Sequence, residues 1–199
     1  MVGLVSEEEN IKVVGLVSRT GRALQRYRKG RRQVVGCIPY RYNKPASSLD
    51  LEAPSSSSSQ QDQLQLQVLL ITSTKGKGML FPKGGWELDE SKKEAALRES
   101  IEEAGVRGIV QGKLGRWSFK SKSKDTWHEG YMFPLLVQHQ FDFWPEHNHR
   151  QRIWMSISEA REVICQQWWM KEALERLVNR LTPRNNNNKL VRTGSVQCT

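Results

Sequence analysis

Two glutamates, Glu102 and Glu103, follow Glu99 by three and four residues in the middle of the chain. On an α-helix these spacings place the three side chains on one face, one above another. Like charges held so close destabilise a helix, and the arrangement is typical of a site where divalent cations bind. Carboxylate oxygens are hard ligands that suit Mg²⁺ or Mn²⁺. The spacing therefore predicts a metal site on a helix.

The residues around the glutamates predict where this helix begins and ends. Ser91 and Glu94 have the spacing of a capping box. Gly105 stands where helices often end in a left-handed residue. Residues 84–85, before the helix, are two glycines, which allow a sharp turn or a close approach. We therefore expect a turn, a helix over about residues 91–104, and a second turn.

A solvated acidic helix face is the simpler interpretation of the same residues. Glutamate is common on exposed helices, and Arg98 could pair with Glu94 or Glu102 at a spacing of four. Glycine turns at both ends favour the metal site, because they indicate a helix held in a fixed geometry.

The segment 84–106 resembles the Nudix box. That pattern is a glycine, five residues, a glutamate, seven residues, Arg-Glu, a hydrophobic residue, any residue, Glu-Glu, any residue, a glycine and a hydrophobic residue. The matching positions are Gly84, Glu90, Arg98, Glu99, Glu102, Glu103, Gly105 and Val106. Ser100 departs from the pattern, because it stands where the family prefers a bulky aliphatic residue.

The resemblance extends beyond the box, over about residues 14–181. It is carried by segments 18–22, 25–27, 31–41, 80–87 and 168–174, which are similar to a plant branch of the Nudix hydrolases. This branch is similar to the diphosphoinositol polyphosphate phosphohydrolases. The resemblance implies an α/β (α+β) fold, a Nudix-type α/β/α sandwich with a mixed sheet and a loop-helix-loop metal site.

The family also implies roles for the residues of the box. Glu99, Glu102 and Glu103 are expected to be catalytic and to bind Mg²⁺ (or Mn²⁺), while Glu90, Arg98 and Gly105 are expected to be structural. The implied reaction is hydrolysis of a phosphoanhydride, in which the protein supplies positioning and positive charge. For the general base, Glu102, Glu129 and Glu146 stay open as candidates.

The charge of the chain indicates an anionic partner. Its 31 Lys and Arg outnumber its 21 Asp and Glu, which gives a formal net charge of +10. Lys83 directly precedes Gly84, so we expect it beside the metal helix. The resemblance favours Arg32, Arg41 and Arg152 as further substrate cations, and we expect Gly84 and Gly85 to contact the substrate. Each arginine taken alone also fits a solvated surface charge.

These features favour a Mg²⁺- or Mn²⁺-dependent pyrophosphatase that acts on a small anionic polyphosphate. Diphosphoinositol polyphosphates and diadenosine polyphosphates are the expected substrates. One alternative is a nucleotide-sugar or ADP-ribose pyrophosphatase. Another is a non-catalytic module that binds RNA or phosphoinositides, but all three carboxylates are present and the chain lacks the interleaved aromatic and basic residues of single-strand RNA platforms. We therefore do not expect a nucleic-acid partner, and the oligomeric state stays open.

Composition also bears on the compartment. The three cysteines form no metal-binding spacing, and Cys37 lies in an apolar run that fits a buried small side chain. No run of 18 apolar residues is found in the sequence, so no membrane span is expected. The acidic residues 7–9 argue against a targeting peptide, so we expect the cytoplasm or nucleus. The basic stretch 19–32 keeps mitochondria as an alternative.

The elements expected outside the box complete one domain, residues 14–181. Residues 1–13 and 182–199 are expected to be flexible tails, and the serine-rich residues 47–61 a disordered loop between two strands. The list of expected strands is 34–40, 64–71, 112–119, 130–137 and 153–155. A helix capped by Ser158 and a final helix over 167–181 follow. Pro39 suggests an edge or a bulge, and the four histidines fit structural or solvated positions.

Overall fold

The computed structural model describes residues 18–43, 65–74, 78–121, 126–164 and 167–182. The predicted tails and the serine-rich loop lie outside these residues, apart from Thr182. The elements in chain order are β1 (Tyr27–Arg28), β2 (Arg31–Asn43), β3 (Gln65–Thr72), β4 (Met79–Leu80), β5 (Lys83–Gly85), α1 (Lys92–Ala104), β6 (Val106–Val110), β7 (Gly115–Lys120), β8 (Trp127–Gln140), β9 (Arg152–Ser156), α2 (Ile157–Val163) and α3 (Trp168–Leu181).

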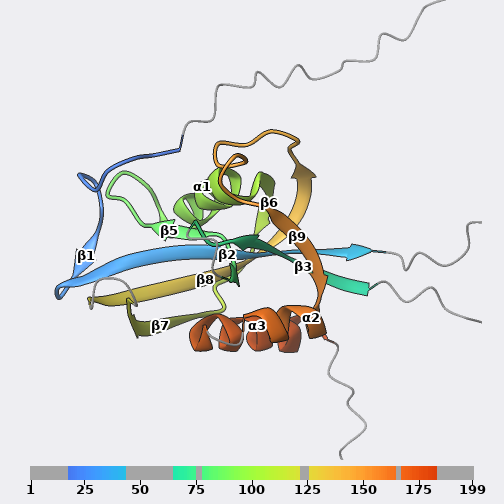
Figure 1. Ribbon diagram of the computed structural model, residues 1–199. Helices are drawn as coiled ribbons and strands as arrows, with labels where there is room; N and C mark the ends of the chain where they lie inside the picture. Colours follow the sequence, from blue (N-terminus) through green and yellow to red (C-terminus); the bar gives the residue numbers. More distant parts are fainter. Residues whose placement is uncertain (1–17, 44–64, 75–77, 122–125, 165–166, 183–199) are drawn as a thin grey trace, which may run out of the picture.

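The strands form one mixed sheet with the order β4-β3-β2-β8-β6 (Figure 1). β1 and β5 also pair with β2, β7 pairs with β8, and β9 pairs with β3. The pair β2–β8 is parallel, and the other named pairs are antiparallel. The register of β2 and β8 sets Arg32 opposite His128. On its other side, β2 pairs with β5 and so positions the two glycines that precede α1.

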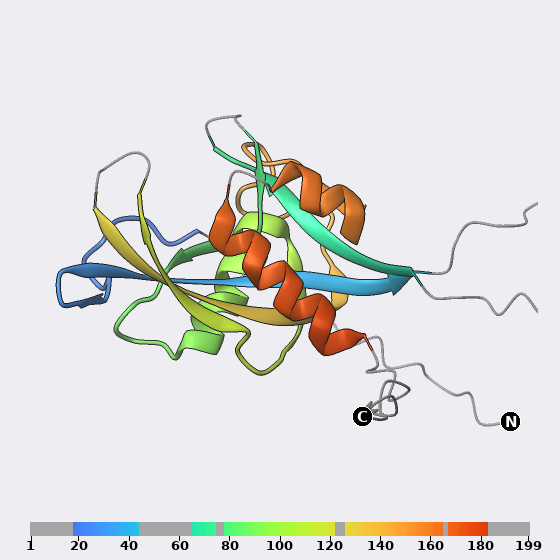
Figure 2. The same cartoon turned by 90° about the horizontal axis from the view of Figure 1, so that it is seen from below.

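Helices cover both faces of this sheet, as predicted. α1 lies on one face, and α2 and α3 lie on the other (Figures 1 and 2). The middle of β2 is buried without a break, which explains its continuous apolar sequence. Cys37 contacts Ala96 of α1, while Met170 and Leu174 of α3 belong to the buried core. The expected α/β/α sandwich is confirmed.

Two local predictions were wrong. α2 is capped by Ser156 instead of Ser158, because Ser156 forms the reciprocal capping box with Glu159. Pro39 does not mark an edge, since β2 lies inside the sheet. Pro39 falls between the part of β2 that pairs with β5 and the part that pairs with β3, where a missing N–H interrupts neither of these two ladders. No helix of the described residues is long and apolar enough to cross a membrane.

Candidate functional site

α1 is fixed at both ends by its own sequence. The Ser91 hydroxyl accepts from the Glu94 N–H, and the Glu94 carboxylate accepts from the Ser91 N–H at 2.8 Å. At the other end Gly105 adopts the left-handed region with φ 62° and donates its N–H to the Ile101 carbonyl at 3.0 Å. The predicted limits of the helix are confirmed.

Ser100, the residue that departs from the family pattern, is fully buried in this helix. Its hydroxyl donates to the Ala96 carbonyl one turn earlier at 2.8 Å. The polar group is therefore satisfied, and the Cys37 thiol packs against the same carbonyl. A small side chain at this position lets β2 approach the helix.

The three predicted carboxylates of α1 are all buried, Glu99 with 8% exposed and Glu102 and Glu103 with 6% each. Burial, together with the charge of Glu103, raises the pKa of Glu99 to about 8. Burial also raises the pKa of Glu102 and of Glu103. Burial disfavours the charged form of these three carboxyl groups on one face of α1. A cation bound beside them would stabilise that charged form.

Arg98 joins the loop before α1 to these carboxylates. Its Nε and one terminal nitrogen donate to the two Glu90 oxygens at 2.9 and 2.8 Å, a bidentate pair. The same guanidinium donates to the Gly85 carbonyl at 2.9 Å and to Glu99 at 2.8 Å. Glu90 also accepts from the Glu87 N–H at 3.1 Å. These contacts fit the structural roles that were expected of Glu90 and Arg98.

Glu103 connects α1 to β5 and to the segment before β9. One of its oxygens accepts from the Lys83 backbone N–H at 2.8 Å, and the other accepts from Arg150. Arg150 is buried and also donates to Glu146 at 2.5 Å. Glu146 in turn donates its backbone N–H to the Glu102 carbonyl at 3.1 Å. Glu146 therefore lies beside the carboxylates.

The two glycines of β5 leave room for side chains from other elements. A Cβ on Gly84 would lie 2.1 Å from a Glu99 carboxylate oxygen. A Cβ on Gly85 would lie 2.1 Å from the Gln25 side-chain oxygen. That oxygen accepts from the Arg32 Nε at 2.7 Å, while the Gln25 amide donates to backbone carbonyls that include Trp86. The glycine pair thus admits both a carboxylate and the residue that holds Arg32.

Cations gather next to this cluster. Burial and the charges of Arg32, Lys83 and Arg22 lower the pKa of His128, so these four side chains lie within electrostatic reach of one another. Arg32, Arg22 and His128 line a pocket of about 210 Å³. Glu99 acts electrostatically on Arg32, which links the pocket to the carboxylates. The structure therefore brings together Lys83 and Arg32, as expected, and adds Arg22 and His128.

Arg41 and Arg152 lie in other surroundings. Arg41 is near the far end of β2, donates to Gln67 at 3.0 Å and stacks 4.1 Å from the Trp154 ring. Arg152 donates to the carbonyls of Ala104 and Gly105 at 2.9 and 3.1 Å, at the end of α1. Arg41 therefore does not lie beside the carboxylates of α1. The guanidinium of Arg152 is occupied by hydrogen bonds to backbone carbonyls.

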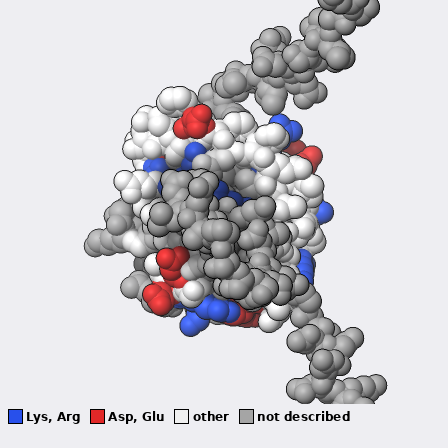
Figure 3. Space-filling view, turned by 90° about the vertical axis from the view of Figure 1, so that its right-hand side faces the viewer, with Lys and Arg blue, Asp and Glu red and all other residues white. Residues whose placement is uncertain are grey.

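The opposite end of the molecule from β1 is seen in Figure 3. On the part of that face that is not grey, the lysines and arginines are scattered among acidic and uncharged residues.

The carboxylates do not converge as a ready-made metal centre. Among the described residues, no group of three His, Cys, Asp or Glu side chains is placed so that it could hold a metal ion. Glu99 and Glu102 instead face Arg98, and Glu103 faces Arg150. The donor set still fits Mg²⁺ or Mn²⁺, because three buried carboxylates with raised pKa values are hard oxygen ligands that lack full neutralisation.

Two candidates for the general base differ in their surroundings. Glu146 acts electrostatically on both Glu102 and Glu103. Glu129 lies on β8 and pairs with Arg116 at 3.3 Å.

Arg22 and Gln25 were not identified as site residues from the sequence, and the contact of Arg150 with Glu103 was not predicted. Arg22 and Gln25 precede the first long strand in a segment without periodicity, and only the pairing of β1, β2 and β5 brings them to the site. Arg150 follows Glu103 by 47 residues, so no local pattern could link the two.

Comparisons with known proteins identify the family of this chain. Residues 59–177 match the NUDIX domain family. Nudix hydrolase 17, mitochondrial, of Arabidopsis thaliana is 54% identical over 188 residues, covering 93% of this chain and 94% of that protein. Nudix hydrolase 4 of the same plant is 59% identical over 170 residues, covering 84% and 76%.

More distant likenesses extend the comparison. Diphosphoinositol polyphosphate phosphohydrolase 2 of Mus musculus is 33% identical over 114 residues, covering 56% of this chain and 62% of that protein. The crystal structure of an Ap4A hydrolase binary complex from C. elegans has a TM-score of 0.53 at 17% identity, covering 75% of this chain and 96% of that one. It supports the fold alone. The chain belongs to the Nudix family and is a hydrolase that acts on pyrophosphate bonds.

Proposed function

We propose that this hydrolase depends on Mg²⁺ or Mn²⁺ and cleaves phosphoanhydride bonds in diphosphoinositol polyphosphates, diadenosine polyphosphates or both. The observation that carries the proposal is the juxtaposition of three buried carboxylates on α1 with the cations Lys83, Arg32 and Arg22. A substrate with several adjacent phosphates needs many cations, whereas ADP-ribose and nucleotide sugars carry less charge. The non-catalytic module is not retained, because two relatives that are 54% and 59% identical to this chain are named hydrolases.

In this proposal Glu99, Glu102 and Glu103 hold the metal. A bound divalent ion neutralises charge on phosphate oxygens and lowers the pKa of a water bound to it. Arg98, held by Glu90, orients Glu99 and Glu102 from the side of the loop. Arg150 orients Glu103 in the same way.

The cations and the base complete the proposed site. Arg32, oriented by Gln25, and Lys83 and Arg22 bind the phosphates of the substrate. Glu102 and Glu146 are the candidates that take a proton from the attacking water, since both belong to the carboxylate cluster. Arg41 and Arg152 have no part in this assignment.

Substitution of a proposed ligand tests the metal site. Glu103→Gln keeps the shape of the side chain and should lower hydrolysis by about a hundredfold or more, because metal catalysis contributes several kcal/mol. Glu162→Gln, at an exposed position on α2, is the matched control and should leave the rate unchanged. Circular dichroism should show the same fold in both. Undiminished turnover in Glu103→Gln would reject the ligand assignment.

The substrate is tested with the purified full chain. Rates are measured on a diphosphoinositol polyphosphate, a diadenosine polyphosphate and ADP-ribose, each with and without Mg²⁺. We expect the first two to be cleaved faster than ADP-ribose, and only with the metal. Faster turnover of ADP-ribose would overturn the substrate class, while titration calorimetry that detects no Mg²⁺ or Mn²⁺ uptake would overturn the metal.

We infer no single compartment from these features. The sequence predicts the cytoplasm or nucleus, whereas Nudix hydrolase 17 is named a mitochondrial protein. Fluorescence microscopy of the chain carrying a C-terminal fluorescent protein distinguishes these compartments. Overlap with a mitochondrial dye would reject the prediction of the cytoplasm or nucleus.

A further inference from the structure

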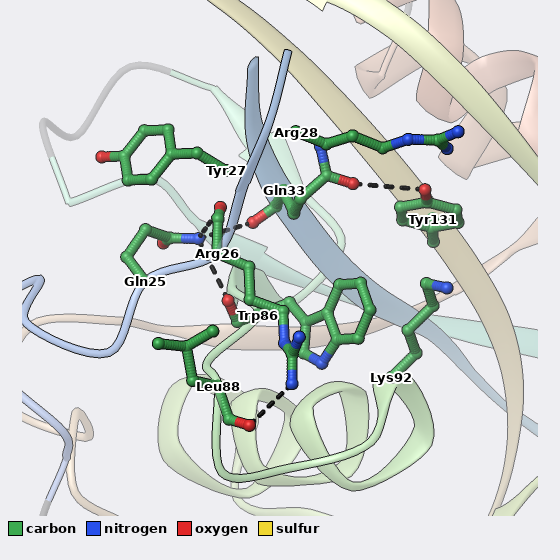
Figure 4. A pocket seen from close by; sticks show the side chains of 9 residues that line it. All are labelled: Gln25, Arg26, Tyr27, Arg28, Gln33, Trp86, Leu88, Lys92 and Tyr131. Carbon is green, nitrogen blue, oxygen red and sulfur yellow. Dashed lines mark hydrogen bonds between the residues drawn. The ribbon is translucent and has the colours of Figure 1, made fainter. Parts of the chain in front are cut away.

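A second pocket, of about 370 Å³, lies between the amino-terminal end of α1 and the strands β1, β2 and β8 (Figure 4). Its walls include Arg26, Arg28, Trp86, Lys92 and Tyr131. None of the described lining residues is acidic, and among them Tyr27 alone also lines the pocket that holds Arg22 and His128. The two pockets are therefore separate hollows at the same end of the molecule.

Positive charge gathers at this second pocket. Lys92, which α1 directs into the pocket, has its pKa lowered by burial and by the charges of Lys113, Arg28 and Arg26. The acidic Glu129 acts on Lys92 in the opposite direction, but Glu129 is paired with Arg116. In the described part of the chain neither Lys92 nor Arg28 makes an ion pair. Such a group of like charges is unfavourable, and a bound anion would relieve it.

The aromatic side chains of the pocket hold these cations. The Lys92 nitrogen lies 4.4 Å from the Trp86 ring centre and 4.7 Å from that of Tyr131. The Arg26 guanidinium stacks at 4.5 Å from the Trp86 ring. The faces of Trp86 are thus contacted by cations. The pocket therefore presents charged N–H donors in a partly desolvated space. Such donors bind phosphate oxygens more strongly than they bind an uncharged nucleobase.

We propose that this pocket is a second anion site, which binds a compact phosphate-rich anion such as a tripolyphosphate group. Lys92 and Arg28 supply its free donors, and Arg26 is held in place because it donates to the carbonyls of Glu87 and Leu88 at 2.8 and 2.6 Å. The site goes beyond the proposed function, since it uses neither the carboxylates nor Arg32.

The pocket adjoins the loop that supports the carboxylates. The Trp86 indole N–H donates to the Glu90 carbonyl at 2.9 Å, and the Glu90 carboxylate holds Arg98. Gln25 lines the second pocket and orients Arg32 of the first. An anion at Lys92 would therefore contact the far side of the same loop, and its binding can be followed at Trp86.

Calorimetric titration of the full chain with tripolyphosphate, without divalent cations, tests the proposal. The wild type should bind two anions. Lys92→Ala should weaken one of them by about tenfold or more, as expected when a charge-assisted hydrogen bond is lost. Lys93→Ala, the exposed neighbour on the same helix, is the matched control and should bind as the wild type. The Arg22→Ala/Arg32→Ala variant should lose the other anion and keep the Lys92 site.

Nuclear magnetic resonance locates the binding. One of the seven tryptophan indole signals is assigned to Trp86 by its absence in Trp86→Phe. It should shift on addition of tripolyphosphate in the wild type and in Arg22→Ala/Arg32→Ala, but not in Lys92→Ala. Equal binding by Lys92→Ala and Lys93→Ala, or a single anion that disappears with Arg22 and Arg32, would overturn the second site. A shift with adenosine and none with tripolyphosphate would overturn the class of ligand.

Discussion

Gly84 and Glu99 approach so closely that a methyl group on the glycine would overlap the carboxylate. The nearest carboxylate oxygen would lie 2.1 Å from the added Cβ, and the carboxylate carbon 2.2 Å. The carboxylate cannot yield freely, since Arg98 holds it from one side. Gly84 is therefore needed because a larger residue would displace the Glu99 carboxylate, whether or not the glycine also permits a turn.

Gly84→Ala should lower the rate of hydrolysis by about a hundredfold, because a displacement of about 1 Å at a catalytic group has effects of this order. Gly112→Ala is the control: its added Cβ meets nothing closer than 3.8 Å, and its rate should equal that of the wild type. Steady-state kinetics on both variants make the comparison. Equal rates for Gly84→Ala and Gly112→Ala would show that the position of Glu99 does not matter to the reaction.

Gln25 is predicted to be a positioning residue for Arg32. Gln25→Leu removes the 2.7 Å hydrogen bond to the Arg32 Nε and should raise KM for a polyphosphate by about tenfold with little change in kcat, because a misplaced arginine weakens binding. The split between KM and kcat separates this role from a general loss of folded protein.

Gln67→Leu is the matched control for this prediction. It removes the equivalent bond, at 3.0 Å, to Arg41 near the other end of β2. Since Arg41 does not reach the carboxylates, KM should stay unchanged. If Gln67→Leu raises KM as much as Gln25→Leu does, the exclusion of Arg41 from the substrate site is wrong.

The contrast between α1 and Arg41 shows what the sequence could predict. The helix and its carboxylate face follow from local patterns: Ser91 and Glu94 begin the helix, Gly105 ends it, and spacings of three and four fix the face. These features depend on neighbours within one or two turns. They are therefore predictable without knowledge of the rest of the fold.

The cations depend instead on the path of long strands. Arg32 and Arg41 lie nine residues apart on β2, which places them about 30 Å from each other in an extended strand. Both arginines flank the same apolar run, but only one end of the strand meets β5. Residues such as Gln25 and Arg150 reach the site through strand pairing across the sheet, which no short motif encodes.

Arg150 is predicted to stabilise the fold strongly. It is buried and pairs with the buried Glu103 and the half-buried Glu146, so Arg150→Met leaves the buried Glu103 without its ion-pair partner and should lower the free energy of unfolding by about 3 kcal/mol. Arg161→Met removes an exposed pair with Glu175 and should lower it by less than about 1 kcal/mol. Urea denaturation measures both. A loss in Arg150→Met no larger than in Arg161→Met would contradict the argument.

Cys37 is predicted to be unreactive in the folded protein. Burial raises the pKa of its thiol to about 12 from an ordinary 9.0, so at a given alkaline pH the native state holds about a thousandfold less thiolate than the unfolded chain. Because the folded pKa is the higher one, this group favours folding below about pH 9. That contribution is lost progressively as the pH rises toward 12.

The measurement uses the Cys165→Ser/Cys198→Ser variant, in which Cys37 is the remaining cysteine. At pH 8 an aromatic disulfide reagent should react slowly with the native protein and rapidly once urea unfolds it, and stability should fall between pH 9 and 11. Cys37→Ala, which keeps a small side chain against Ala96, should show a weaker decline over the same range. Rapid modification of the native variant, with its circular dichroism unchanged, would mean that β2 and α1 separate often enough to expose the thiol, contrary to the tight packing at Ser100.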